Sequence, residues 1–136
     1  NFKLGGSLPE FRKNNGSLRS LNLFGTNFSG SLPDSIGNLK MLSMIDLSYC
    51  NFYGSINPNV NGKPNTIGEL AFSNVSSNLA VLDLSFNNLE GQISVSILNF
   101  GGLQSLGLSS NNFNAFPFNG PQQLKYLTNI DLSNNW

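Results

Sequence analysis

The sequence repeats one phrase, Leu-x-x-Leu-x-Leu-x-x-Asn-x-(Leu/Phe), and this repeat constrains the fold more than any other feature. The fullest copy begins at Leu79, and other copies begin at Leu18, Leu42, Leu103 and Leu127. The starts lie 24, 37, 24 and 24 residues apart, so the period is constant and is interrupted once. Such a period is typical of solenoids, in which each repeat packs only on its neighbours.

Each Leu-x-Leu segment alternates apolar and polar residues, which predicts a short strand with its leucines on one face. Strands stacked one per repeat pair in parallel, and the rest of each repeat returns behind them. Apolar residues recur along that return: Phe28, Leu32, Ile36 and Leu39 in the first complete repeat, and Leu89, Ile93, Ile97 and Phe100 in the third. The pattern predicts an α/β solenoid with a parallel sheet, made mostly of strands and loops with short helical turns.

We interpret the chain as a single repeat array spanning residues 1–136. Partial repeats occupy 1–17 and 127–136, and complete repeats occupy 18–41, 42–78, 79–102 and 103–126. The second complete repeat is 37 residues long and not 24, and its segment at about 57–66 is predicted to leave the core as a loop. The apolar layer of that repeat would then come from Ile67, Leu70, Phe72 and Val75.

The position that follows Leu-x-Leu-x-x is predicted to be a buried corner. It is occupied in turn by Thr26, Cys50, Asn87, Asn111 and Asn135. A buried amide offers two donors and an acceptor, so asparagine can bond the backbone of its own and adjacent turns. Threonine and cysteine supply only part of that bonding, and we expect the first two complete repeats to be held less tightly here.

Composition excludes several classes of function. Lys+Arg and Asp+Glu both total 7, which leaves no net charge and no cluster of the kind that binds nucleic acid. The absence of histidine removes histidine-based catalysis and most zinc sites. The single cysteine, Cys50, cannot form an internal disulfide and is interpreted as structural. We expect no catalytic residues, no metal and no cofactor.

Polar or variable positions of the predicted strands form four rows across the repeats, all expected to face solvent. The rows are Ser20, Met44, Val81, Ser105 and Asn129; Asn22, Asp46, Asp83, Gly107 and Asp131; Phe24, Ser48, Ser85, Ser109 and Ser133; and Gly25, Tyr49, Phe86, Ser110 and Asn134. Exposed apolar residues on such a face are plausible anchors for a partner. The candidate ligand-binding residues are Asn22, Phe24, Met44, Asp46, Tyr49, Val81, Asp83, Phe86 and Asp131. The alternative is that Tyr49 and Phe86 only stack on each other.

Asp46 and Asp83 fall on adjacent strands, about 5 Å apart, a separation that would suit a retaining glycosidase. An open face offers no apolar pocket to raise one carboxylate's pKa, so a structural or recognition role is favoured. Three N-x-Ser sequons begin at Asn15, Asn27 and Asn74 and predict N-glycosylation if the chain is secreted.

The segment LRSLNLFGTNFSGSLPDSIGNL, residues 18–39, closely resembles the plant-specific extracellular leucine-rich repeat, LxxLxLxxNxLxGxIPxxIGxL. DLSYCNFYGSI and DLSFNNLEGQI are similar to the same unit. The resemblance covers nearly the whole chain apart from 57–66 and extends to the ectodomains of plant receptor-like proteins and receptor-like kinases. It implies a right-handed superhelix with a second small sheet at the LxGxI segment, a concave recognition face and N-glycans.

The resemblance implies a non-enzymatic recognition module that binds a protein, peptide or glycan on the concave face, with a co-receptor as a further partner, in defence or developmental signalling. The implied location is the extracellular face of the plasma membrane or the apoplast. The alternatives are a secreted inhibitor of a cell-wall-degrading enzyme and a purely structural fragment. Members of the family usually carry cysteine-containing caps, a signal peptide and a membrane span, none of which occurs in this sequence. We therefore expect the chain to be an internal fragment or the product of an incomplete gene model, with apolar residues exposed at both ends of the array.

Overall fold

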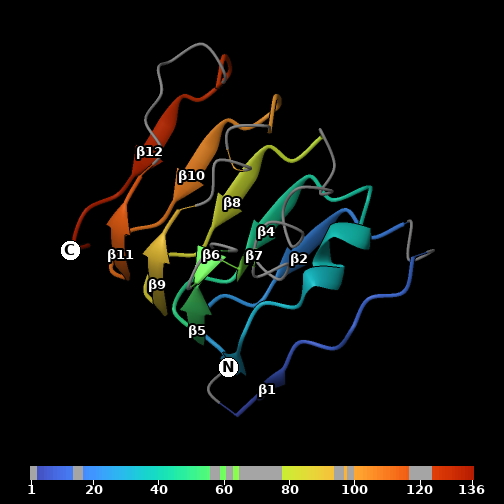
Figure 1. The fold of residues 1–136 in the computed structure, drawn as a ribbon. Coiled ribbons are helices and arrows are strands. Elements are labelled where there is room, and N and C mark those ends of the chain that lie inside the picture. Colours follow the sequence, from blue (N-terminus) through green and yellow to red (C-terminus); the bar gives the residue numbers. More distant parts are fainter. Residues whose placement is uncertain are drawn as a thin grey trace.

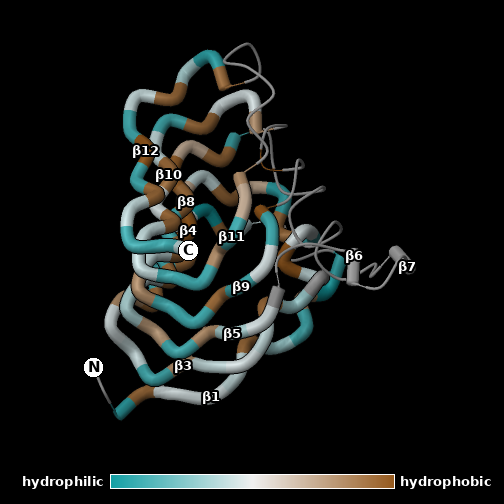
Figure 2. Tube along the Cα trace, turned by 60° about the vertical axis from the view of Figure 1, so that its left-hand side comes forward, coloured by the Kyte–Doolittle hydropathy of each residue, from teal (hydrophilic) through white to brown (hydrophobic). Residues whose placement is uncertain are grey.

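The computed structural model describes residues 3–13, 17–55, 59–60, 63–64, 78–93, 97, 100–116 and 124–136. In this part the chain coils into a stack of turns in which two parallel sheets form separate columns (Figures 1 and 2). The front sheet has the order β12-β10-β8-β4-β2. Its strands are β2 (Ser20–Asn22), β4 (Met44–Asp46), β8 (Val81–Asp83), β10 (Ser105–Gly107) and β12 (Asn129–Asp131). The predicted solenoid is therefore confirmed.

The middle residues of the three central front strands point into the core, as the alternating pattern predicts. Ile45, Leu82 and Leu106 are register partners on β4, β8 and β10, and none of them is exposed to solvent. The flanking residues of the same strands face outward and are half-buried. The repeat period thus fixes both the register and the inward face of the sheet.

The second sheet forms at the LxGxI segments, as the family resemblance implies. It has the order β1-β3-β5-β9-β11, and its strands are β1 (Gly5–Ser7), β3 (Asn27–Gly30), β5 (Asn51–Ser55), β9 (Asn88–Gln92) and β11 (Asn112–Ala115). Gly30, Gly54 and Gly91 adopt φ values of 96°, 93° and 82°, a region that favours glycine. The fourth complete repeat lacks this glycine, and the register between β9 and β11 shifts between Phe113 and Ala115.

The return segment of the first complete repeat contains a short 3-10 helix, η1 (Asp34–Asn38). The buried Pro33 precedes it in an extended conformation, and the Pro33 carbonyl accepts a hydrogen bond from the Ile36 N–H at 3.0 Å. Ile36 and Leu39 are fully buried behind the front sheet. η1 is one of the short helical turns predicted from the repeat, and the return of this repeat packs inward as expected.

Within the range predicted to be a loop excursion, the structure describes two short strands, β6 (Asn59–Val60) and β7 (Lys63–Pro64). They pair with each other in antiparallel fashion and join neither of the two parallel sheets. The four residues expected to complete the core of this repeat, Ile67, Leu70, Phe72 and Val75, lie outside the described residues. In the part of the chain that is described, no helix is long and apolar enough to cross a membrane.

Candidate recognition surface

The corner asparagines form the hydrogen-bonding network that the sequence predicts. The Asn87 amide nitrogen (Nδ2) donates to the carbonyls of Leu47 and Leu84 at 2.8 and 3.0 Å, and its oxygen (Oδ1) accepts from the Phe52 N–H at 2.9 Å. Asn111 and Asn135 repeat the arrangement one and two turns later. Since the Leu84 carbonyl accepts from both Asn87 and Asn111, each amide joins its own turn to the preceding one.

In the first two complete repeats, weaker groups take the place of the corner amide. The Thr26 hydroxyl donates to the Leu23 carbonyl at 2.8 Å, and the Cys50 thiol donates to that carbonyl at 3.1 Å. The two side chains lie 3.5 Å apart, Oγ1 to Sγ. Cys50 is buried and forms no disulfide. The bonding differs between the early and late repeats as expected, and the lower stability of the early corners stays a prediction.

The register of the front sheet confirms the first two rows of outward-facing residues. Ser20, Met44, Val81, Ser105 and Asn129 are successive register partners, as are Asn22, Asp46, Asp83, Gly107 and Asp131. Gly107 interrupts the second row, and the Asp83 carboxylate occupies the space beside it. A Cβ atom at position 107 would lie 2.6 Å from Asp83 Oδ1.

The expectation that the third row faces solvent is wrong for its central members. Ser48, Ser85 and Ser109 are buried, with at most 7% of their surface exposed. Each strand ends two residues earlier, so the alternation of inward and outward residues no longer applies. The Ser48 hydroxyl and N–H both donate to Asp46 Oδ1, at 2.6 and 3.1 Å. The Ser85 hydroxyl and N–H donate to Asp83 Oδ1 in the same way.

The fourth row shares a backbone conformation that the sequence analysis did not predict. Gly25, Tyr49, Phe86, Ser110 and Asn134 all have positive φ angles, between 54° and 63°. This left-handed region favours glycine and asparagine and is rare for bulky side chains. Glycine at position 25 and asparagine at position 134 were the only signal of it in the sequence.

Three exposed aromatic side chains lie together at the end of the front strands, and we call Phe24, Tyr49 and Phe86 the aromatic ridge. The rings of Tyr49 and Phe86 are stacked, with centroids 4.0 Å apart and planes 13° apart. The Phe24 ring meets Tyr49 edge-on at 5.5 Å. Between 42% and 55% of each side chain remains exposed. The stacking considered as an alternative to binding therefore exists, and it leaves half of the ring surface open to a partner.

The backbone holds the ridge rigidly. The Tyr49 N–H donates to the Ser85 carbonyl at 3.0 Å, and the Phe86 N–H donates to the Ser109 carbonyl at 2.9 Å. These hydrogen bonds continue the pairing of the front sheet beyond its strands. The rings therefore need little further ordering when a ligand binds.

The carboxylates of Asp46 and Asp83 lie on directly paired strands, as predicted. Each is half-buried and engages one oxygen with the serine two residues later. This arrangement stabilises the turn after the strand, as Asn22 does in the first complete repeat by accepting from the Phe24 N–H at 3.0 Å. Among the described residues, no group of three histidine, cysteine or acidic side chains is placed to hold a metal ion.

Asp131 titrates below its ordinary pKa of 3.8. The main cause is the hydrogen bond from the Ser133 N–H, and the Ser133 and Ser109 hydroxyls lower the pKa further. Because folding depresses this pKa, the stabilisation is present above the pKa of the unfolded chain and is lost as pH falls through the folded value. In a carboxyl-detected NMR titration we expect Ser133→Ala to raise the Asp131 pKa and Ser110→Ala to leave it unchanged. Equal effects of the two variants would contradict this assignment.

Of the three sequons, only Asn27 lies within the described residues. Asn27 is exposed at the start of β3, and its N–H donates to the Leu4 carbonyl at 2.8 Å. Asn15 and Asn74 lie outside the described part of the chain. Asn27 follows the corner residue of the turn that carries Phe24, so it remains a predicted glycosylation site near one end of the aromatic ridge.

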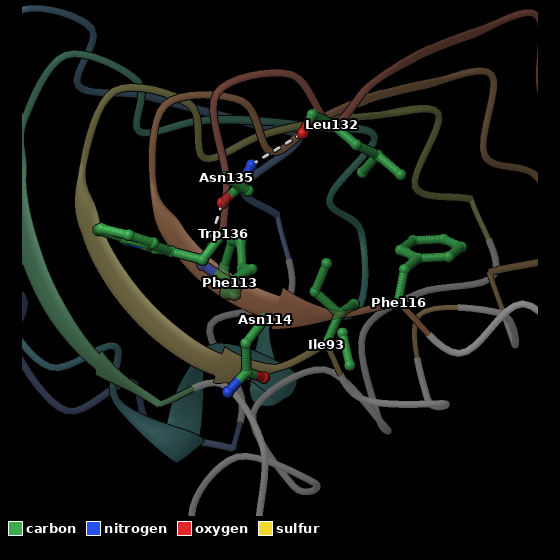
Figure 3. A pocket seen from close by; sticks show the side chains of 8 residues that line it. Ile93, Phe113, Asn114, Phe116, Leu132, Asn135 and Trp136 are labelled. Atoms are coloured by element: carbon green, nitrogen blue, oxygen red, sulfur yellow. Dashed lines mark hydrogen bonds between the residues drawn. The ribbon is translucent and has the colours of Figure 1, made fainter.

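An apolar hollow of about 240 Å³ lies at the end of the stack that carries β12 (Figure 3). Its lining includes Ile93, Phe113, Phe116, Leu132 and Trp136, and none of its lining residues titrates. Ile130 and Trp136 are 40% and 90% exposed at this end, and Leu4 is 51% exposed at the other. The predicted exposure of apolar residues at both ends is confirmed.

Comparisons with known proteins support the same repeat. The family model described as Leucine Rich Repeat matches residues 17–39 and 78–100. Similar solved structures include the ectodomain of the Arabidopsis thaliana membrane receptor kinase GASSHO1/SCHENGEN3 in complex with CASPARIAN STRIP INTEGRITY FACTOR 2, which is 32% identical with a TM-score of 0.76 over 96% of this chain. The Arabidopsis receptor kinase HAESA, in complex with the peptide hormone IDA and the co-receptor SERK1, is 29% identical with a TM-score of 0.73 over 96% of this chain.

A plant ice-binding protein is also similar, with 29% identity and a TM-score of 0.75 over 98% of this chain. The chain spans 14% of the GASSHO1/SCHENGEN3 structure, 20% of the HAESA structure and 39% of the ice-binding protein. No curated protein matches the sequence.

Proposed function

Because the chain is a leucine-rich-repeat protein of the plant extracellular type, we propose that it is a recognition module whose front sheet binds a peptide ligand through the aromatic ridge. The observation that carries this proposal is the position of Tyr49 and Phe86. Both place large rings at left-handed backbone positions, where bulky residues are disfavoured, and both leave their rings half exposed. The left-handed conformation recurs at this position of every front-sheet turn, so what distinguishes these two turns is that bulky aromatic residues accept it.

The chemistry of the ridge suits a peptide. Rigid aromatic rings bury much apolar surface at little cost in side-chain entropy, and they dominate the energetics of many protein interfaces. Met44 and Val81, which are paired on β4 and β8, add apolar surface to the same face. Asn22 and the aspartates of the second row supply hydrogen-bond acceptors beside it. Similar ectodomains were solved with a peptide hormone and a co-receptor, which supports the same class of partners here.

The proposed setting is the extracellular face of the plasma membrane or the apoplast. Receptor ectodomains of similar sequence and fold support this location. A glycan on Asn27 would then border the ridge beside Phe24 without covering Tyr49 and Phe86, which lie on later turns.

Ice binding is less well supported by this face. A surface that matches a solid lattice needs the same polar groups at a constant spacing along its length. The second row of this sheet instead contains asparagine, aspartate and glycine in no regular order. Aromatic rings are exposed on three of the turns. We therefore favour peptide recognition over ice binding.

The proposal can be tested with a displayed library of random 12-residue peptides selected on the immobilised chain. Dissociation constants of the enriched peptides are then measured for the wild type and for Tyr49→Asn/Phe86→Asn. We expect the double variant to weaken binding at least tenfold, because central aromatic contacts are each worth about 2 kcal/mol or more. Asparagine is chosen because position 134 shows that it fits this backbone conformation.

The matched control is Tyr53→Asn, which removes a tyrosine that is 57% exposed on β5 of the second sheet. This variant is expected to bind like the wild type. Failure to enrich any peptide, or equal affinities for the ridge variant and the wild type, would overturn the proposal.

A further inference from the structure

We propose that the ligand presents an arginine side chain, which stacks on the aromatic ridge and pairs with the carboxylates of Asp46 and Asp83. This inference rests on the proposed function and names the chemistry of the peptide. The distribution of charge on the front sheet indicates this chemistry. Three of the seven acidic residues, Asp46, Asp83 and Asp131, stand in one row of that sheet.

No lysine or arginine occurs in β2, β4, β8, β10 or β12, or in the three residues that follow each of these strands. Arg19 is the nearest basic residue along the chain, and it precedes β2 at the opposite end of the strand from Asn22. The chain as a whole has no net charge. The face around the ridge is therefore acidic on a neutral molecule, and charge complementarity favours a cationic partner.

The carboxylates of Asp46 and Asp83 can accept further hydrogen bonds from such a partner. In both aspartates the Oδ1 atom accepts from the following serine. The Oδ2 atoms of Asp46 and Asp83 accept no hydrogen bond from the described residues. The two side chains lie on paired strands about 4.8 Å apart, so two like charges stand on neighbouring strands. A guanidinium group has five donors and can bridge two carboxylates.

The aromatic ridge begins three residues after these carboxylates on the same two turns. Asp46 precedes Tyr49, and Asp83 precedes Phe86. Each aspartate accepts from the serine that lies between it and the ring, which holds one carboxylate oxygen on the ridge side of the strand, and the Asp83 carboxylate also lies beside Gly107 of the next strand. Arginine, unlike lysine, has a planar cation that stacks on an aromatic face and donates sideways to carboxylates. The acidic row and the ridge together match this side chain.

The aspartates can be neutralised without removing their structural role. Asn22 occupies the same row and accepts the same backbone hydrogen bond with its side-chain oxygen. Asp46→Asn/Asp83→Asn should therefore keep the turn after each strand while removing both charges. The control is Glu90→Gln, which removes an exposed charge from β9 of the second sheet.

The probes are the peptides enriched in the library selection described above and versions in which each arginine is replaced by neutral citrulline. We expect the enriched peptides to contain arginine. Asp46→Asn/Asp83→Asn and the citrulline replacement should each weaken binding at least tenfold. When the variant protein is tested with the citrulline peptide, binding should be little weaker than with either change alone. Binding to the wild type should also weaken as salt is raised from 50 to 500 mM, and Glu90→Gln should leave it unchanged.

Peptides without arginine that lose affinity on Tyr49→Asn/Phe86→Asn, but not on Asp46→Asn/Asp83→Asn, would overturn this inference and leave the proposed function intact. Enrichment of no peptide, combined with binding of the chain to a glycan array, would overturn both.

Discussion

Replacing Asn111 with alanine is expected to lower the free energy of unfolding by about 3 kcal/mol, although the side chain is small and uncharged. The Asn111 amide makes four hydrogen bonds in a buried corner: it donates to the carbonyls of Leu84, Leu108 and Ser109 and accepts from the Leu89 N–H. Each such bond is worth about 1 kcal/mol, and alanine supplies none of them. Urea unfolding followed by circular dichroism measures the loss.

The matched control is Cys50→Ala at the corresponding corner of an earlier repeat. The Cys50 thiol makes a contact of 3.1 Å with the Leu23 carbonyl and longer contacts with Ser48 and Thr26. Thiols are weak donors, so we expect a loss below about 1.5 kcal/mol. Hydrogen exchange should also quicken at the Leu89 amide of Asn111→Ala. Equal losses of stability in the two variants would contradict the idea that the amide corners hold the later turns more tightly.

Replacing Leu82 with alanine is expected to cost about 3 kcal/mol or more, the usual range for a leucine in a closed core. Leu82 has no exposed surface and lies between its register partners Ile45 and Leu106, which are also fully buried. The neighbouring turns cannot collapse into the cavity without losing the pairing of the front sheet. The urea midpoint should fall, and the dependence of the unfolding free energy on urea should stay unchanged.

The same substitution at Leu21 serves as the comparison. Leu21 is the equivalent residue of β2, at the edge of the front sheet, and it is only half-buried. Because β2 has one neighbouring strand in the front sheet and not two, Leu21→Ala should cost about half as much as Leu82→Ala or less. Similar costs at the two positions would contradict a core built from layers that touch only their neighbours.

The front sheet and its inward leucines could be predicted from the sequence because both follow from a fixed period. Once the strands are placed at the start of each repeat, 37 and 24 residues apart, Ile45, Leu82 and Leu106 must share one face, and the register follows without further information. The corner asparagines were predictable for the same reason, since a buried amide at the end of a strand must bond to backbone.

The conformation that follows each strand could not be read from that period. Alternation predicts that Ser48 and Ser85 face solvent, whereas their hydroxyls bond to the preceding aspartates and are buried. The left-handed residues then direct Tyr49 and Phe86 outward. A turn of this kind depends on three or four neighbouring residues, so the spacing of apolar residues along the sequence does not predict it. The contact between Phe24 and Tyr49, placed in different rows by the sequence, depends on the same turn.

The most direct test of the account compares stability and affinity in one variant, Tyr49→Asn/Phe86→Asn. Relief of the left-handed strain, about 1 kcal/mol per residue, should offset the lost stacking, which is worth about 1 kcal/mol. The unfolding free energy should therefore stay within about 1 kcal/mol of the wild type, while affinity for the enriched peptides falls at least tenfold. A loss of several kcal/mol of stability with unchanged affinity would show that the ridge serves the fold and not a ligand.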